Sequence, residues 1–208
     1  MVLHRLIPDR PVQRLTRCIV GLACFGSGIS MFVAAHLGLA PWDVFHQGVS
    51  RHTGISLGWV IEIVGFLLLL LWIPLRQRPG VGTVLNAFEI GLVVNLIGEH
   101  LPTTDRLIPR LAYVIGAVVV IAVGSGLYIG AGLGTGPRDG IMIGLAARGL
   151  SVRVTRTVLE VVVMVVGIVL GGHIGIGTLA FVVGIGPLLH SLLPKLDIRP
   201  VVALEPVT

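Results

Sequence analysis

Long, nearly uncharged apolar runs constrain this chain more than any other feature of its sequence. A run of about 20 apolar residues matches the roughly 30 Å hydrocarbon thickness of a bilayer. The runs are continuous rather than alternating, which excludes a β-barrel. We therefore predict an all-α polytopic membrane protein, embedded in a lipid bilayer, with six transmembrane helices. Their expected ranges are 17–37, 57–75, 81–99, 108–130, 153–171 and 175–193.

Two short motifs indicate that the chain is one unit written twice. A Pro-x-Asp sequence occurs at residues 41–43 and again at 137–139, about 96 residues later. Each copy follows one apolar run and precedes a second, and a glycine–threonine turn (80–83 and 175–178) then leads into a third. Internal repeats of this kind define a fold, so we predict two repeats of three transmembrane helices.

The basic residues predict how these repeats cross the membrane. Twelve of the fifteen Lys and Arg side chains fall on one side of a six-helix arrangement, and only Arg51, Arg106 and Arg110 fall on the other. Positive charge accumulates on the cytoplasmic side, so both termini are predicted to be cytoplasmic. Three helices per repeat is an odd number. The second repeat must therefore enter from the opposite face, which is the inverted topology of many transporters.

Short helices are expected after helices one and four. Residues 42–51 are amphipathic and fit an interfacial helix, whereas residues 140–147 are almost wholly apolar and fit a re-entrant one. The predicted organisation is a cytoplasmic N-terminal segment (1–16), a first three-helix repeat (17–100), an extracytoplasmic linker (101–107), a second three-helix repeat (108–193) and a cytoplasmic tail (194–208).

Three glutamates within the predicted spans are candidates for binding a substrate or ion: Glu62, Glu89 and Glu160. An ionisable group at membrane depth is costly, so its presence favours a function. Glu62 and Glu160 lie about one turn apart on equivalent helices, where together they could bind a cation or carry protons. Alternatively they serve helix packing, with Arg156 pairing with Glu160 along one helix. Asn86 is a further polar candidate near Glu89.

Asp43 and Asp139 occupy matching places in the two Pro-x-Asp motifs. In one interpretation they form a binding site or gate element repeated at the two faces. In the other, each stabilises the positive first turn of a helix that begins at the proline. His36 and His46 flank Asp43, but their spacing matches no standard ligand motif. We therefore expect neither a metal nor another cofactor.

Glycines in and after the fourth predicted helix also have two interpretations. Gly126 and Gly130 have the small-xxx-small spacing that lets helices pack closely. Alternatively, together with Gly134 and Gly136, they unwind the helix beside a substrate. A nucleotide-binding loop is rejected because the Walker lysine is absent.

Other functional classes find little support. The net charge is +5, but no cluster of basic and aromatic residues indicates nucleic acid as a partner. No His-Glu-x-x-His motif occurs, so the chain is not expected to be an enzyme. Trp59 and Trp72 lie near the two ends of the second predicted helix and are expected at the membrane interfaces.

The Pro-x-Asp motifs, taken with the Gly-x-Gly-Thr turns, resemble those of the YczE/YyaS/YitT-like bacterial membrane proteins. The similarity covers about residues 15–195. The resemblance implies a bacterial inner-membrane protein, and it supplies no catalytic residues.

The sequence as a whole favours a small transporter or permease-like protein for an unknown small solute or ion. Six short helices enclose little volume, so a homodimer is a further expectation. The alternative is a non-transporting membrane scaffold or regulatory protein. Such a protein would act on a protein partner through residues 148–156 and the C-terminal tail.

Overall fold

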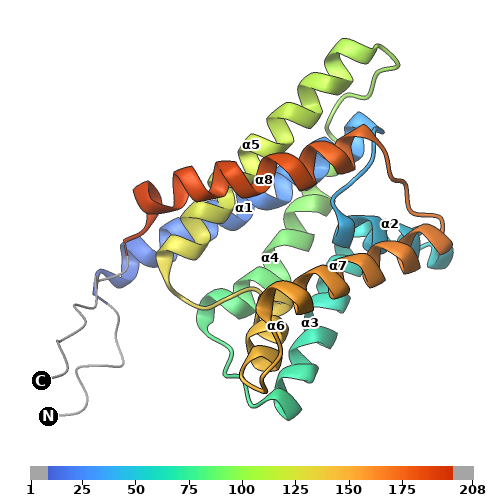
Figure 1. Ribbon diagram of the computed structural model, residues 1–208. Coiled ribbons are helices and arrows are strands. Elements are labelled where there is room, and N and C mark those ends of the chain that lie inside the picture. The colour runs from blue at the N-terminus through green and yellow to red at the C-terminus, as the bar shows by residue number, and fades with distance from the viewer. Residues whose placement is uncertain (1–8, 199–208) are drawn as a thin grey trace, which may run out of the picture.

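The computed structural model describes residues 9–198, so predictions that fall on residues 1–8 and 199–208 lie outside the described part. Within it the chain is all-α (Figure 1). The helices are α1 (Pro11–Ala35), α2 (Pro41–Thr53), α3 (Leu57–Leu75), α4 (Val81–Gly98), α5 (Leu107–Ala131), α6 (Pro137–Ala146), α7 (Val152–Val169) and α8 (Ile176–Leu196). The six long predicted helices and the two short ones are all present.

Prolines mark three of the helix starts. Pro11, Pro41 and Pro137 each occupy the first turn of a helix, where a missing N–H costs nothing and the fixed φ is already helical. The sequence predicted that the first helix begins at residue 17. In the structure α1 begins earlier, at Pro11. Arg14 consequently lies on α1, although the sequence placed it before the first helix.

Helices α1 and α5 form the antiparallel centre of the molecule. The Arg14 guanidinium, near the start of α1, donates to the Ala131 carbonyl at the end of α5 (3.2 Å). The Arg110 guanidinium, near the start of α5, donates to the Ala35 carbonyl at the end of α1 (2.6 Å). The last carbonyls of a helix have no partner within that helix. Each arginine donates a hydrogen bond to such a carbonyl at the end of the opposite helix.

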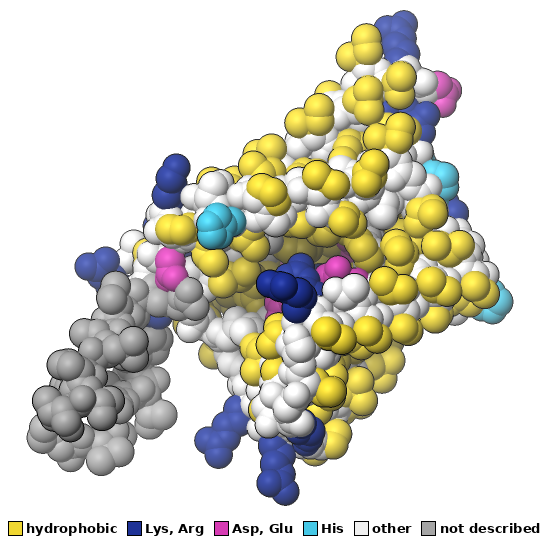
Figure 2. Space-filling model, in the orientation of Figure 1, with side chains coloured by type: hydrophobic (Ala, Val, Ile, Leu, Met, Phe, Trp, Pro, Cys, Tyr) yellow, Lys and Arg dark blue, Asp and Glu magenta, His cyan; other side chains and the backbone are white. Residues whose placement is uncertain are grey.

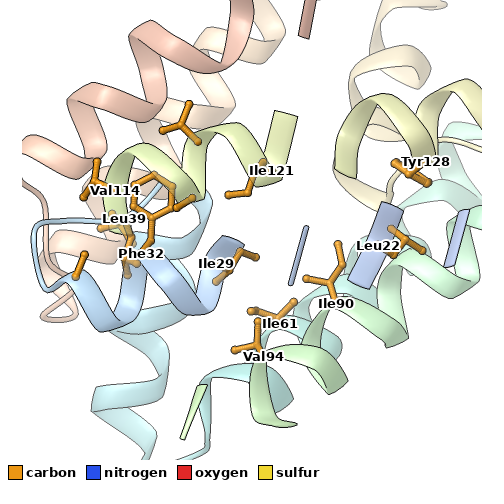
Figure 3. Packing of buried hydrophobic residues seen from close by; sticks show 14 of the residues in the cluster. Leu22, Ile29, Phe32, Leu39, Ile61, Ile90, Val94, Val114, Ile121 and Tyr128 are labelled. Atoms are coloured by element: carbon orange, nitrogen blue, oxygen red, sulfur yellow. The ribbon is translucent and has the colours of Figure 1, made fainter. Parts of the chain in front are cut away.

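The apolar core surrounds this helix pair (Figure 3). Leu22 and Ile29 of α1, Ile121 of α5 and Ile90 of α4 belong to one buried cluster. Glycines at the crossing permit a close approach, because a Cβ on Gly21 would stand 2.7 Å from a backbone oxygen of α5. The centre of the bundle is therefore held by packing between α1, α4 and α5.

Five helices are long and apolar enough to cross a membrane: α1, α3, α4, α5 and α8. The outward faces are rich in hydrophobic side chains (Figure 2), as lipid contact requires. Helix α7 is not among the five. Its 18 residues include Arg153, Arg156 and Glu160, so its composition is less apolar than that of the others.

The two ends of the described chain lie close together. The Arg17 guanidinium on α1 donates to the Leu196 carbonyl at the end of α8 (2.7 Å). The backbone N–H of Ile198 donates to the Gly130 carbonyl of α5 (3.1 Å). A Cβ on Gly130 would clash with the backbone at Leu196, and one on Gly126 with the Leu196 side chain. These glycines therefore serve packing, and α5 is not unwound beside them.

Paired contacts join the loop after α1 to the start of α8, and the loop after α5 to the start of α4. The Gly177 N–H donates to the Leu37 carbonyl (2.7 Å), and the Gly82 N–H donates to the Leu133 carbonyl (2.8 Å). The glycine–threonine turns therefore have a definite structural role. Each one hydrogen-bonds the loop that leads into a Pro-x-Asp motif of the other half.

A third pair of contacts fixes the short helices. Arg51 at the end of α2 donates to the Gly171 carbonyl after α7 (2.6 Å). Arg148, after α6, donates to the carbonyls of Pro74 and Leu75 at the end of α3. Each short helix is thus anchored to a long helix of the other half.

Trp72 does not face lipid or water, as an interfacial tryptophan would. Its side chain is buried, and its indole N–H donates to the Pro137 carbonyl at the first turn of α6 (2.9 Å). The ring covers Gly140, where even a Cβ would collide with it. Trp59, by contrast, is 56% exposed. Both tryptophans lie near the ends of α3, and their positions in the sequence do not show which of them faces a neighbouring helix.

Candidate functional site

A cavity of about 170 Å³ lies where the first turns of α2 and α6 approach each other. Side chains of α1, α4, α5, α7 and α8 complete its walls. In Figure 2, basic and acidic side chains gather in a hollow between α7 and α8, surrounded by hydrophobic surface. The hollow places these charges within a surface that is mainly hydrophobic along α7 and α8.

Four of the six candidate binding residues line this cavity: Asp43, Asp139, Asn86 and Glu160. Asp43 and Asp139 come from the first turns of α2 and α6, so the two Pro-x-Asp motifs contribute to one site. The sequence predicted a site or gate element in each motif, at separate faces. It did not predict that the two motifs share a cavity.

The middle residues of the two motifs contact each other. The Arg138 guanidinium carbon lies 5.4 Å from the centroid of the Trp42 ring and 5.9 Å from that of Phe25. A guanidinium within about 6 Å of an aromatic face is attracted by the ring quadrupole. The cavity wall thus places the guanidinium of Arg138 against two aromatic rings.

Asp43 is buried together with His46, and its Oδ1 lies 3.2 Å from the imidazole Nδ1. Burial lowers the pKa of His46; the hydrogen bond and charge of Asp43 oppose that shift, and Arg138 reinforces it. The imidazole is therefore neutral near pH 7 and donates its Nδ1–H to the carboxylate. His46 consequently contributes no positive charge beside Asp43.

Neither aspartate forms a side-chain cap on its helix. Ala40 and Gly136 occupy the N-cap positions of α2 and α6, and no side-chain cap hydrogen bond is formed at either. Asp43 and Asp139 do stand in the first turns, where the helix dipole favours negative charge. The two aspartates therefore favour the helix starts through their charge and not through a capping hydrogen bond. Both carboxyl groups also line the cavity.

Tyr128 is a site residue that the sequence analysis missed. It lies on α5 and is 4% exposed, and its hydroxyl has no hydrogen-bond partner within residues 9–198. Asp139 Oδ2, Asn86 Nδ2 and the Tyr128 hydroxyl all surround Gly136, each within 3.6 Å of where its Cβ would be. A lone tyrosine in a glycine-rich apolar run was the available signal, and it was not used.

The predicted pair of Glu62 and Glu160 does not form. Glu160 lies at the edge of the cavity and accepts a hydrogen bond from Arg156 Nε (2.9 Å), as the packing alternative proposed. Glu62 is buried between α3 and α4, with its side chain against Gly91. Glu89 is half-buried on α4 and does not line the cavity. Equivalent helices thus place their glutamates in different surroundings.

The described residues contain no group of three or more His, Cys, Asp or Glu side chains that could hold a metal ion. Asp43 and His46 form a pair only, and His36 is exposed at the end of α1. The carboxyl, amide and hydroxyl groups of the cavity instead suit a ligand held by hydrogen bonds and charge.

A family of unknown function, DUF6198, matches residues 12–194 of the chain. The chain belongs to this family. Two similar proteins of Bacillus subtilis carry the names YczE, an uncharacterised membrane protein, and YyaS, so the predicted YczE/YyaS-like membership is confirmed. The family relationship and the apolar helices together make this an integral membrane protein.

The similarity extends over most of each relative. An uncharacterised protein of Haemophilus influenzae is 34% identical over 176 residues, which cover 84% of this chain and 81% of that protein. YczE is 31% identical over 187 residues, covering 88% and 87%, and YyaS is 29% identical over 185 residues, covering 86% and 91%. No solved structure matches the chain.

Proposed function

We propose that this DUF6198 protein is a small-solute transporter of the bacterial inner membrane, and that the cavity between its two Pro-x-Asp motifs is the substrate site. One observation carries the proposal: Asp43 and Asp139, from matching positions of the two halves, line the same cavity. Secondary transporters bind their substrates between repeats, at interrupted or short helices. The short helices α2 and α6 fit that description.

The proposal includes an inverted-topology repeat. The antiparallel pairing of α1 and α5, with Arg14 at Ala131 and Arg110 at Ala35, supports it. Two equivalent helices run antiparallel when one repeat is inverted relative to the other. Each of these contacts also joins segments that the charge distribution assigns to one membrane side. The Arg17–Leu196 contact likewise supports termini that share the cytoplasmic side.

In this arrangement α7 is the sixth span. Its 18 residues extend about 27 Å as a helix, close to the thickness of the hydrocarbon core. Arg156 and Glu160 both line the cavity and pair with each other, so two of its three charges turn away from lipid. This accounts for the composition that sets α7 apart from the apolar helices.

An asymmetry of packing indicates how the site is reached. Helix α3 packs along α4, whereas their counterparts α7 and α8 are not packed together in the described part of the chain. The cavity opens at the resulting gap (Figure 2). In a protein of two inverted repeats, the complementary state has α7 against α8 and a gap between α3 and α4. Exchange between the two states would expose the cavity to each membrane side in turn.

Cysteine accessibility tests transport without knowledge of the substrate. Ser125 lies on α5 in the cavity wall and is 6% exposed, and Ser125→Cys would be placed in a Cys18→Ala, Cys24→Ala background. A small trimethylammonium methanethiosulfonate would be added to right-side-out and to inside-out vesicles. We expect labelling from both sides. Labelling from one side alone, or from neither, contradicts transport and favours the scaffold function.

A lipid-facing position provides the matched control. Leu67 on α3 is 54% exposed and apolar, so Leu67→Cys should meet hydrocarbon rather than water. The charged reagent should not label it from either side. Labelling of this control would mean that the reagent also reaches positions outside the cavity, so that labelling of Ser125→Cys would not report access to the cavity.

A further inference from the structure

The cavity has one polar end that is not internally satisfied. The Tyr128 hydroxyl is buried and has no hydrogen-bond partner among the described residues. A buried hydroxyl without a partner is costly, so its presence in a cavity wall points to a ligand that supplies the missing bond. Asp139 and Asn86 lie around the same point next to Gly136. Three polar groups of different helices therefore converge on one place.

The formal charge of the lining favours a positive ligand. Three acidic side chains, Asp43, Asp139 and Glu160, face two basic ones, Arg138 and Arg156. Glu160 and Arg156 pair with each other, and His46, whose pKa is lowered by burial, adds no positive charge beside Asp43. The remaining set is two carboxylates and one guanidinium. A ligand with one positive charge would therefore make the cavity neutral.

The aromatic wall favours an organic cation over a bare metal ion. Arg138 places a guanidinium over Trp42 and Phe25, and such faces attract ammonium and guanidinium groups. Most of the other lining side chains are apolar, among them Ile121, Ile185 and Leu189. Calcium prefers six or more oxygen ligands, and the described residues contain no group of three or more His, Cys, Asp or Glu side chains that could hold a metal ion.

We propose that the cavity binds a small organic monocation, an ammonium or guanidinium head that carries a short apolar group. The head lies between the Asp139 carboxylate and the Tyr128 hydroxyl, and the apolar group lies against Ile121 and its neighbours. The inference rests on the proposed function, because it names the substrate class of the same site. A volume of about 170 Å³ is below the 300–1,000 Å³ typical of drug-sized ligands, so the solute is small.

The test measures saturable binding by the purified full-length protein, through its thermal unfolding midpoint and by calorimetry. The probes are methylguanidinium and propylammonium. Propanol and propionate match propylammonium in size, and sodium and potassium chloride supply inorganic cations. We expect saturable stabilisation by one or both organic cations and by none of the other compounds. Saturable binding of propionate, propanol or an inorganic cation in their place overturns the inference.

Two variants tie binding to the proposed geometry. Tyr128→Phe keeps the ring and removes a hydroxyl that has no partner within the described chain, so the protein should fold normally. We expect affinity for the bound cation to fall about tenfold or more, as for loss of a hydrogen bond to a charged group. Asp139→Asn should reduce it further. Wild-type affinity in Tyr128→Phe contradicts the placement even if Asp139→Asn fails to fold.

A matched control comes from the same helix. The Tyr113 hydroxyl on α5 donates to the Pro102 carbonyl (3.1 Å) and does not line the cavity. Tyr113→Phe should therefore bind the cation with wild-type affinity. An equal loss in Tyr113→Phe would show that tyrosine hydroxyls act through stability, which would overturn the assigned role of Tyr128.

The accessibility experiment separates this inference from the proposed function. Binding of organic cations together with one-sided labelling of Ser125→Cys would support the ligand class and defeat transport. Two-sided labelling without any binding of organic cations would support transport and defeat the ligand class.

Discussion

Arg138 and Trp42, the middle residues of the two Pro-x-Asp motifs, contact each other across the centre of the molecule. The guanidinium carbon lies 5.4 Å from the centroid of the indole ring. The two residues lie 96 positions apart and arrive on the first turns of different short helices. Their contact lies within the cavity wall, where it links the two halves of the chain at the proposed substrate site.

This contact predicts a coupling between the two side chains. Trp42→Leu, Arg138→Gln and the double variant form a mutant cycle, measured by thermal unfolding in detergent. We expect a coupling of about 1–2 kcal/mol, because a desolvated cation–π contact has that strength. Additive effects of the two single variants would mean that the contact contributes nothing.

The loop glycines before the motifs predict a second result. Gly38 and Gly134 have φ values of +102° and +132°, and a Cβ on either would collide with the opposite glycine–threonine turn. A non-glycine residue with such a φ value costs about 1 kcal/mol or more from backbone strain alone. Gly38→Ala and Gly134→Ala should therefore each destabilise the protein by more than this amount. The measurement is the unfolding midpoint of each variant.

Gly186→Ala is the matched control for these glycines. Gly186 lies within α8, and nothing stands within 4 Å of where its Cβ would be. Alanine there should leave stability unchanged or raise it by up to about 1 kcal/mol. Equal destabilisation by all three substitutions would contradict the assigned role of the loop contacts.

Trp72 predicts a third result. Trp72→Phe keeps an aromatic ring over Gly140 but removes the hydrogen bond to the Pro137 carbonyl. The expected loss is about 1–2 kcal/mol, from the bond and from the smaller ring. Trp59→Phe, at an exposed position, should change stability by less than about 0.5 kcal/mol. Comparable losses in the two variants would contradict the docking of α6 on α3.

His46 predicts how stability changes with pH. Burial lowers the pKa of His46 below its usual 6.5, against the opposing effect of Asp43 and with the help of Arg138. Between the folded pKa and 6.5 the unfolded chain binds a proton that the folded protein does not, so stability falls as pH falls through this range. The measurement compares unfolding midpoints at about pH 7.5 and about pH 5.5, which bracket the ordinary histidine pKa.

Two glutamine variants isolate this effect. His46→Gln should show a smaller loss of stability at the lower pH than the wild type does. His173→Gln, at an exposed position, should behave like the wild type. A loss of the same size in all three proteins would assign the pH dependence to groups other than His46.

The helices were predictable because each depends on a local run of residues. Apolar length located the six long helices, and the two prolines located the starts of α2 and α6. Membership of the family was also predictable, since it depends on short motifs. What a side chain faces depends instead on a partner from elsewhere in the chain. That is why Trp72 was placed at an interface and is found beneath α6.

Only part of the candidate site was predictable, because the rest depends on contacts between distant segments. Asp43 and Asp139 were identified because they repeat, and Asn86 because it is polar in an apolar run. The convergence of Asp139, Asn86 and Tyr128 around Gly136 depends on how α4, α5 and α6 cross, which no single segment encodes. Glu62 and Glu160 occupy comparable places on equivalent helices, yet only Glu160 lines the cavity.

Sidedness of the loops after the two short helices tests the account most directly, because the account requires the halves to enter the membrane from opposite faces. His52→Cys at the end of α2 and Ala147→Cys after α6 are exposed positions. Each would be made without Cys18 and Cys24 and labelled in intact cells with a membrane-impermeant thiol reagent. The account predicts labelling at 52 and protection at 147 until the membrane is opened. Labelling of both positions from the same side would contradict the inverted repeat and, with it, a transport site shared by the two motifs.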